Sequence, residues 1–207
     1  MSRPVFARLY PHMNKAMERG GMGERRQALL AGLTGHVIEI GAGDGANFTY
    51  YPPTVTRVLA VEPEPRLRAL AQAAALEAPA PVEVVDATAE HLPVAEQSLD
   101  AAVFSMVLCT IPSPEAALAE ALRVMRPGGQ LRFLEHVRAD TPGLTRAQRL
   151  LDVTLWPRLM GGCHTGRDTA TTITQAGFTI DRLDPFLFPE ARTPLSFHIL
   201  GTATRPH

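Results

Sequence analysis

The stretch VIEIGAGDGANF (residues 37–48) joins an apolar run to a glycine-rich loop, and the fold class follows from it. The run HVIEI (36–40) has the composition of a short strand that is buried on both faces of a sheet. Gly41, Gly43 and Gly45 then follow at alternate positions, and glycine lets a backbone approach a ligand where a side chain would collide. This order favours a loop that holds a nucleotide-like ligand. A tight turn from strand to helix would use the same glycines.

Beyond this stretch, apolar runs alternate with helical patterns, which is typical of an α/β fold with parallel strands. Four further strands are predicted at 57–62, 82–86, 99–108 and 130–137. Prolines open two predicted helices, at 63–78 and 113–125. After residue 137 the alternation of strands and helices ends. The sequence predicts a helix over 145–160 with an interruption at Pro157, a helix over 166–178, and two last strands within 178–186 and 194–205.

The composition excludes several classes of protein. A chain of 207 residues, 45% hydrophobic and 20% charged, is predicted to form one folded domain. Its net charge of −1 provides no basic surface for nucleic acid. No apolar run approaches the roughly 20 residues of a membrane-spanning helix, and the start of the chain lacks the apolar core of a signal peptide. The two cysteines match neither a disulfide framework nor a zinc site, so we expect a cytoplasmic protein without a membrane anchor or a metal.

Two cofactor fingerprints fit the glycine loop. Gly41, Gly43 and Ala46 satisfy the permissive dinucleotide pattern G-x-G-x-x-G/A, whereas Glu39 followed by the three alternate glycines satisfies the pattern of methyl-donor sites. Glu62 ends the second strand 21 positions after Gly41, where an acidic side chain can accept hydrogen bonds from ribose hydroxyls. Both kinds of cofactor carry a ribose, so Glu62 does not separate them.

The charge of the loop favours the methyl donor. Asp44 lies in the middle of the glycine loop, where it would repel the two negative charges of a pyrophosphate. S-adenosylmethionine has no phosphate and carries a sulfonium cation, which suits Glu39 and Asp44. A dinucleotide oxidoreductase is therefore the remote alternative.

Four segments together resemble the class I S-adenosylmethionine-dependent methyltransferases (the methyltransferase type 11 domain). They are VIEIGAGDGANF, VLAVEP, EHLPVAEQSLDAAV and EALRVMRPGGQL, and they extend over most of the chain. The resemblance implies a Rossmann-like α/β fold with a seven-stranded sheet in the order 3-2-1-4-5-7-6, strand 7 antiparallel and helices on both faces. It also implies S-adenosylmethionine as the cofactor and S-adenosylhomocysteine as its product.

A narrower resemblance links GDGANFTYYPP, VLCTIPSP, FLEHV and GGCHTGRDT to the group that includes the membrane-anchored thiol S-methyltransferases of animals. The chain departs from this group by lacking an N-terminal apolar anchor and by having Asp44 where threonine is usual. The resemblance to this group implies a small thiol or dithiol as the favoured methyl acceptor. The alternatives are N- or O-methylation of a small molecule, a lipid headgroup or a quinone-type substrate, and a non-catalytic protein that binds S-adenosylmethionine.

The predicted site residues lie at the carboxyl ends of the strands, where open α/β sheets bind ligands. The expected cofactor-binding residues are Glu39, Gly41, Ala42, Gly43, Gly45, Asn47, Glu62, Pro63, Thr88, Ala89, Glu90 and Ser105. The expected acceptor-binding residues are Tyr10, Met13, Met106, Leu108, Cys109, Glu135, His136 and His164, of which His136 and His164 are the candidate catalytic residues. Several of these have a structural alternative: His136 can bond the rim backbone, His164 can pack instead of forming a metal or redox pair with Cys163, and Cys109 can fill the core.

The resemblance also suggests how the single domain (1–207) is divided. We expect a helical lid at 1–31, a cofactor-binding core at 32–137, a helical wall for the acceptor at 138–177 and the last two strands at 178–207. The expected partner is the small-molecule acceptor, and the expected state is a monomer or a homodimer.

Overall fold

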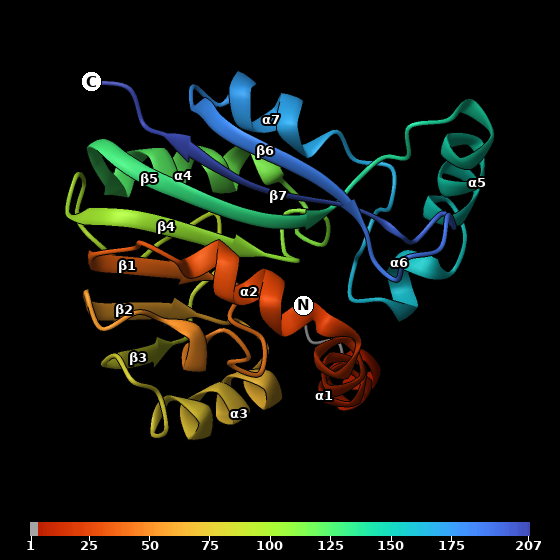
Figure 1. Cartoon of the computed structure of the whole chain (residues 1–207). Coiled ribbons are helices and arrows are strands. Elements are labelled where there is room, and N and C mark those ends of the chain that lie inside the picture. Colours follow the sequence, from red (N-terminus) through yellow and green to blue (C-terminus); the bar gives the residue numbers. More distant parts are fainter. Residues whose placement is uncertain (1–3) are drawn as a thin grey trace.

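A seven-stranded sheet organises the computed structural model, which describes residues 4–207 (Figure 1). Its strands have the order β3-β2-β1-β4-β5-β7-β6, and β7 runs antiparallel to both of its neighbours. The strands are β1 (Gly35–Ile40), β2 (Val55–Val61), β3 (Val82–Val85), β4 (Leu99–Ser105), β5 (Met125–His136), β6 (Thr179–Leu187) and β7 (Phe197–Thr204). The order and the antiparallel strand that the resemblance implied are confirmed.

Helices cover both faces of the sheet, as the apolar strands require. They are α1 (Pro4–Met17), α2 (Gly23–Leu30), α3 (Pro65–Ala75), α4 (Pro114–Val124), α5 (Pro142–Asp152), α6 (Trp156–Leu159) and α7 (Thr169–Gln175). Along β1, Val37 packs in one apolar cluster with residues of α2 and α3, whereas Ile38 packs in another with residues of α4 and α7. Successive strand residues point to opposite faces, so β1 must be apolar at both positions.

Three predicted elements differ from the structure. Strand β4 ends at Ser105 instead of residue 108, because Met106 takes a left-handed conformation with φ of 59°. Strand β5 begins at Met125, so the segment RPGG (126–129) is an irregularity within the strand and does not precede it. The helix expected over 145–160 is two helices, α5 and α6. Pro157 lies in the first turn of α6, and a helix is interrupted before a proline because proline lacks an N–H and constrains the residue before it.

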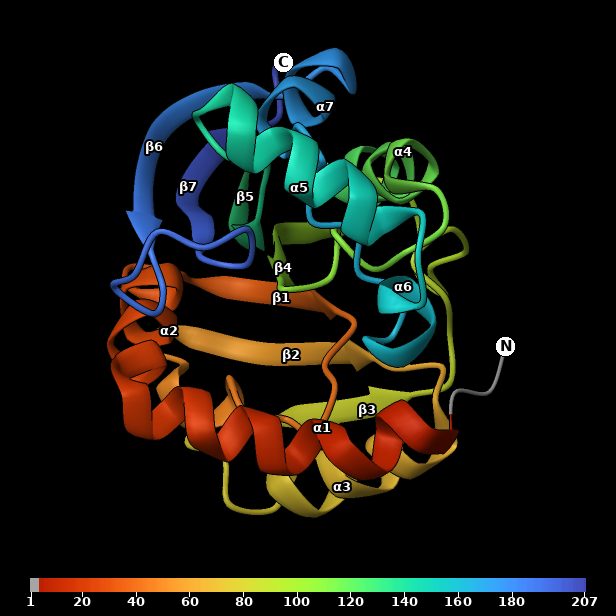
Figure 2. The same ribbon diagram turned by 90° about the vertical axis from the view of Figure 1, so that its right-hand side faces the viewer.

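The N-terminal segment is helical, as expected, although residues 1–3 of that prediction lie outside the described residues. A π-helical turn (Glu18–Met22) with Gly21 at φ of 99° joins α1 to α2. Helices α1, α5 and α6 lie beyond the carboxyl ends of the parallel strands (Figure 1), and they face the viewer in Figure 2. These three helices therefore surround the sheet edge at which the glycine loop begins.

Candidate functional site

A cavity of about 460 Å³ opens at this edge of the sheet. The glycine loop, the end of β2, the segment after β3, the segment after β4 and helix α1 all contribute to it. Its lining residues are Phe6, Tyr10, Ile40, Gly41, Gly43, Val61, Glu62, Pro63, Glu64, Pro65, Leu67, Ala87, Thr88, Ala89, Glu90, Met106, Val107, Thr110, Ile111, Pro112 and Gly161. A cavity of this size suits a small organic ligand.

The glycine loop forms the floor of the cavity. The Gly43 N–H donates to Glu62 Oε2 at 2.9 Å, and the Glu64 N–H donates to Glu62 Oε1 at 2.9 Å. Gly43 has φ of 60°, and a Cβ on it would lie 2.9 Å from the Tyr10 ring. A Cβ on Gly41 would collide with Val107. The loop therefore needs glycine at both positions, for its conformation and for the space above it.

The carboxylate of Glu62 is well placed for a ligand with hydroxyl groups. Glu62 lines the cavity at the end of β2 and is only 6% exposed. Its burial raises the pKa of the carboxyl, and the N–H groups of Glu64 and Gly43 work in the opposite direction. These N–H groups hold both oxygens in place, and each oxygen has a further lone pair for a ligand hydroxyl.

Other predicted cofactor residues support the loop from behind. Glu39 accepts from Asn47 Nδ2 at 2.9 Å and from the Tyr51 hydroxyl at 2.7 Å, and burial raises its pKa to about 7. Glu39, Ala42, Gly45, Asn47 and Ser105 are all buried and do not line the cavity. Their position suits a role in holding the shape of the loop.

A buried arginine, which the sequence analysis missed, ties the N-terminal helices to this loop. Arg26 is 2% exposed and donates to Asn47 Oδ1 at 2.8 Å and to Ser105 Oγ at 3.2 Å. Its Nε forms an ion pair with Glu18 at 2.6 Å. In the sequence this arginine lies among charged residues of a short helix, which is the usual pattern of an exposed surface, so no signal separated it from its neighbours.

The same network reaches the acidic residue of the loop through α1. Arg26 Nη2 donates to Asn14 Oδ1 at 2.8 Å, and Asn14 Nδ2 donates to Asp44 Oδ1 at 2.7 Å. Burial raises the pKa of Asp44 despite the hydrogen bond from Asn14. Helix α1 is thereby fixed over the cavity, where it places Phe6 and Tyr10 in the wall.

The carboxyl end of β4 forms the opposite wall. Glu135 is fully buried and accepts from the N–H groups of Val107 at 3.0 Å, Leu108 at 2.9 Å and Cys109 at 3.2 Å. Burial raises the pKa of Glu135 to about 7. This carboxyl group holds the turn that begins at the left-handed Met106, so it shapes the cavity wall without lining it.

Three histidines and two cysteines gather behind this wall. His136 is 4% exposed, and its Nδ1 lies 3.6 Å from Cys163 Sγ. Its ring stacks on His198 with 5.1 Å between centroids, and burial together with the neighbouring His136 lowers the pKa of His198 to about 4. The His164 N–H donates to the Cys109 carbonyl oxygen at 2.8 Å.

The structure divides the predicted residues into two groups. Those that line the cavity are Tyr10, Gly41, Gly43, Glu62, Pro63, Thr88, Ala89, Glu90 and Met106. Met13, Leu108, Cys109, Glu135, His136 and His164 do not line it. The sequence did not indicate the wall residues that come from separate segments, among them Phe6, Val107, Ile111 and Gly161, because no local pattern distinguishes an apolar cavity wall from a core.

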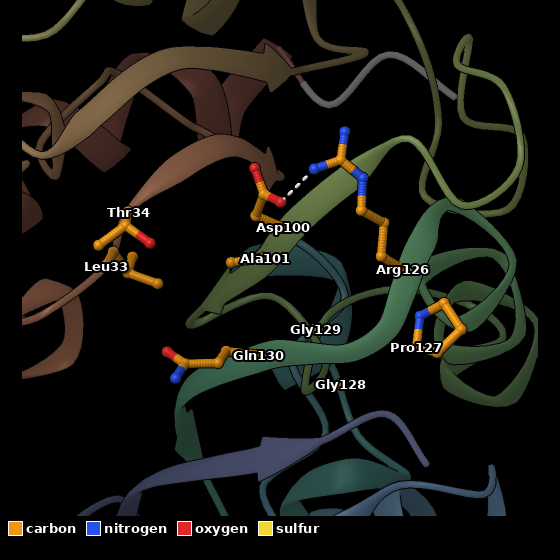
Figure 3. Close-up of a pocket in the computed structure, with 9 residues that line it drawn as sticks. All are labelled: Leu33, Thr34, Asp100, Ala101, Arg126, Pro127, Gly128, Gly129 and Gln130. Carbon is orange, nitrogen blue, oxygen red and sulfur yellow. Dashed lines mark hydrogen bonds and ion pairs between the residues drawn. The ribbon is translucent and has the colours of Figure 1, made fainter. Parts of the chain in front are cut away.

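A second hollow, of about 250 Å³, lies at the opposite edge of the sheet (Figure 3). Asp100 and Arg126 point toward each other there and form an ion pair between β4 and β5. The other oxygen of Asp100 accepts from the His36 N–H at 2.7 Å. These contacts join three neighbouring strands, so we interpret this polar hollow as structural.

Within residues 4–207, no group of three or more His, Cys, Asp or Glu side chains is arranged to hold a metal ion. None of the helices described there is long and apolar enough to cross a membrane.

Comparisons with known proteins agree with this geometry. Residues 38–133 match the family model of the methyltransferase domain. The thiol S-methyltransferase TMT1B of Rattus norvegicus is 35% identical over 82% of this chain and 70% of its own length. The human TMT1B is 31% identical over 97% of this chain and 84% of its own length. Among solved structures, a Thermotoga maritima protein described as a S-adenosylmethionine-dependent methyltransferase and possible histamine N-methyltransferase has a TM-score of 0.70 at 22% identity, covering 98% of this chain and 99% of its own.

The structural match establishes the fold, and the sequence matches establish the family. The cradle of glycines beneath a cavity, with a buried carboxylate at the end of β2, fits S-adenosylmethionine as the cofactor. The chain belongs to the S-adenosylmethionine-dependent methyltransferases, in the sequence family that includes the thiol S-methyltransferases TMT1A and TMT1B.

Proposed function

We propose that this methyltransferase methylates the sulfur of a small thiol. The observation that carries the proposal is the 31–37% identity to the thiol S-methyltransferases TMT1A and TMT1B, which extends over 82–97% of the chain. The longest of these alignments covers 97% of the chain, which is far more than the cofactor-binding half alone.

The cofactor side of the cavity has the groups that the donor needs. Glu62 would accept hydrogen bonds from the ribose hydroxyls, and the backbone at Gly41 and Gly43 would pass close beneath the donor. Thr88, Ala89 and Glu90 would border the adenine. When bound, S-adenosylmethionine supplies an electrophilic methyl group on a positively charged sulfur.

The remaining wall suits an apolar acceptor. Phe6, Met106, Val107 and Ile111 line it, and together with Gly161 they would exclude water from the reacting atoms. An ordinary thiol has a pKa near ~8.5, so a small fraction ionises at neutral pH without a strong base. Much of the rate can then come from holding the two reacting atoms in line.

Several sequence predictions become part of this proposal. The helical lid at 1–31 would act through Phe6 and Tyr10, and the helical wall at 138–177 would act through Gly161. His136 and His164 are retained as candidate catalytic residues. They lie behind the wall, so direct contact with an acceptor would require movement of the segment after β4 or of the segment around Gly161.

A panel of acceptors tests the proposal. Purified protein is incubated with methyl-labelled S-adenosylmethionine and matched sets of small thiols, amines and phenols, and labelled products are separated by chromatography. We expect label on thiols, and its loss in Glu62→Ala but not in the exposed control Glu83→Ala. Label only on amines or phenols would overturn the thiol assignment. Binding of S-adenosylhomocysteine by calorimetry without transfer to any acceptor would favour the non-catalytic alternative.

A further inference from the structure

The two cysteines of the chain lie beside each other in the structure. The His164 N–H donates to the Cys109 carbonyl oxygen at 2.8 Å. The His164 nitrogen lies about 2.4 Å from the Cα of Cys163, and the Cys109 oxygen lies about 2.4 Å from the Cα of Cys109. The two Cα atoms are therefore at most about 7.6 Å apart, and bent geometry brings them closer, toward the range of about 4.4–6.8 Å that a disulfide spans. The two thiols are close enough that each cysteine is a main cause of the pKa shift of the other.

The two thiols have opposite environments. Cys109 is 1% exposed, and the neighbouring Cys163 together with burial raises the pKa of its thiol. Cys163 remains partly exposed, and the neighbouring Cys109 together with His136, whose Nδ1 is 3.6 Å away, lowers the pKa of its thiol. An outer thiolate beside an inner thiol is the arrangement that dithiol oxidoreductases use, because the outer sulfur attacks and the inner one resolves.

A proton acceptor for the inner thiol is also present. The Glu135 carboxyl accepts from the Cys109 N–H at 3.2 Å, and its charge is one of the causes that raise the pKa of the Cys109 thiol. Its pKa is raised to about 7 by burial, so it can take up a proton near neutral pH. The methyl-transfer proposal gives no role to this carboxyl beyond shaping the wall.

We propose that Cys163 and Cys109 form a thiol–disulfide exchange centre that reduces low-molecular-weight disulfides. The Cys163 thiolate attacks one sulfur of a disulfide RS–SR, which forms a mixed disulfide Cys163–S–SR and releases RS⁻. The Cys109 thiol gives its proton to Glu135 and its sulfur attacks Cys163 Sγ, which closes a Cys109–Cys163 disulfide and releases the second RS⁻. The disulfide substrate is reduced and the cysteine pair is oxidised. An external low-molecular-weight thiol returns the pair to the reduced state.

The position of the centre connects it to the methyl-donor cavity. Thr110 follows Cys109 directly, Gly161 precedes Cys163 by two positions, and both Thr110 and Gly161 line the cavity. A thiolate released at this place emerges at the cavity wall, where it would be the acceptor for methylation. This link rests on the proposed function, whereas the exchange reaction itself requires no methyl donor.

The exchange is tested on the whole chain without S-adenosylmethionine. The protein is reduced, freed of reductant and incubated with 2-hydroxyethyl disulfide, and intact mass and released thiol are followed. We expect two equivalents of released 2-mercaptoethanol per chain and a mass lower by two hydrogen atoms. Because the chain has two cysteines, such a mass change can only be a Cys109–Cys163 bond. No released thiol, or stable adducts without ring closure, would overturn the proposal.

Two variants separate the steps. Cys109→Ser should retain the mixed disulfide on Cys163, visible as an adduct of one half of the disulfide, and Cys109→Ala provides the same test if serine is not tolerated in the core. Cys163→Ser should react on the order of 100-fold more slowly, since the remaining thiol is buried and protonated. An adduct that forms equally fast on Cys109 would contradict the assigned order.

The outcome is independent of the acceptor panel. Disulfide exchange without methylation of any thiol would leave this inference standing and refute the proposed function. Methylation of free thiols without exchange at the cysteine pair would refute this inference alone.

Discussion

Replacing Arg26 with methionine should destabilise the protein strongly, because it leaves several buried groups without a partner. Arg26 is 2% exposed, and its guanidinium bonds to Glu18, Asn47, Ser105 and Asn14. Methionine fills similar space but donates no hydrogen bond. A buried group left without its hydrogen-bond partner costs about 1–3 kcal/mol, so the loss of the donor to Asn14, Asn47 and Ser105 should cost about 3–5 kcal/mol in total, a large share of the roughly 5–15 kcal/mol that holds a domain folded.

Urea denaturation measures this loss. With a dependence of about 2 kcal/mol per molar urea, the midpoint should fall by about 2 M. The matched control is Arg57→Met, since the ion pair of Arg57 with Glu83 has side chains 59% and 54% exposed and should contribute at most about 1 kcal/mol. The double variant Arg26→Met with Glu18→Gln should regain about 1 kcal/mol, because no carboxylate charge is then left without its partner.

If Arg26→Met lowers the free energy of unfolding no more than Arg57→Met does, the buried network does not hold α1 and α2 in place. A Glu18→Gln substitution that adds its full cost to Arg26→Met would show that the stranded charge is not the source of the loss.

Three further predictions concern the cofactor site. Glu62→Ala should raise the dissociation constant for S-adenosylhomocysteine about 10- to 100-fold in calorimetry, since a charge-assisted hydrogen-bond acceptor is lost; an unchanged constant would mean that Glu62 does not hold the ribose. Gly43→Ala should weaken the same binding, because φ of 60° and a Cβ 2.9 Å from the Tyr10 ring force the loop to shift, and tight binding by this variant would contradict the assigned cradle. The pKa of Glu39 is raised from 4.5 to about 7 in the fold, so between these pH values the folded state binds a proton that the unfolded chain releases. The free energy of unfolding should therefore fall as pH rises from 4.5 to about 7. Denaturation curves of Glu39→Gln should show a smaller fall over the same range.

Much of the fold was predictable from local patterns. The apolar run at 36–40, the alternating glycines after it and the segments near Glu62 and RPGG placed the chain in its fold class, and the family that they resemble implied the strand order. Such patterns work because a parallel strand buried on both faces must be apolar throughout, and a loop beneath a ligand must lack side chains. Element ends were less predictable, since the end of β4 at Ser105 depends on the contacts of Glu135 with the turn that follows.

The sequence by itself determined the parts of this protein that depend on neighbouring residues: the strand, the cradle of Gly41 and Gly43, and the acidic end of β2 at Glu62. Only the tertiary structure decided which distant residues meet. It buried Arg26 against the glycine loop and brought Cys109 beside Cys163, 54 positions later in the chain. Long-range contacts of this kind depend on how helices and loops pack at the carboxyl ends of the strands. Local sequence patterns do not predict that packing, because they reflect only neighbouring residues.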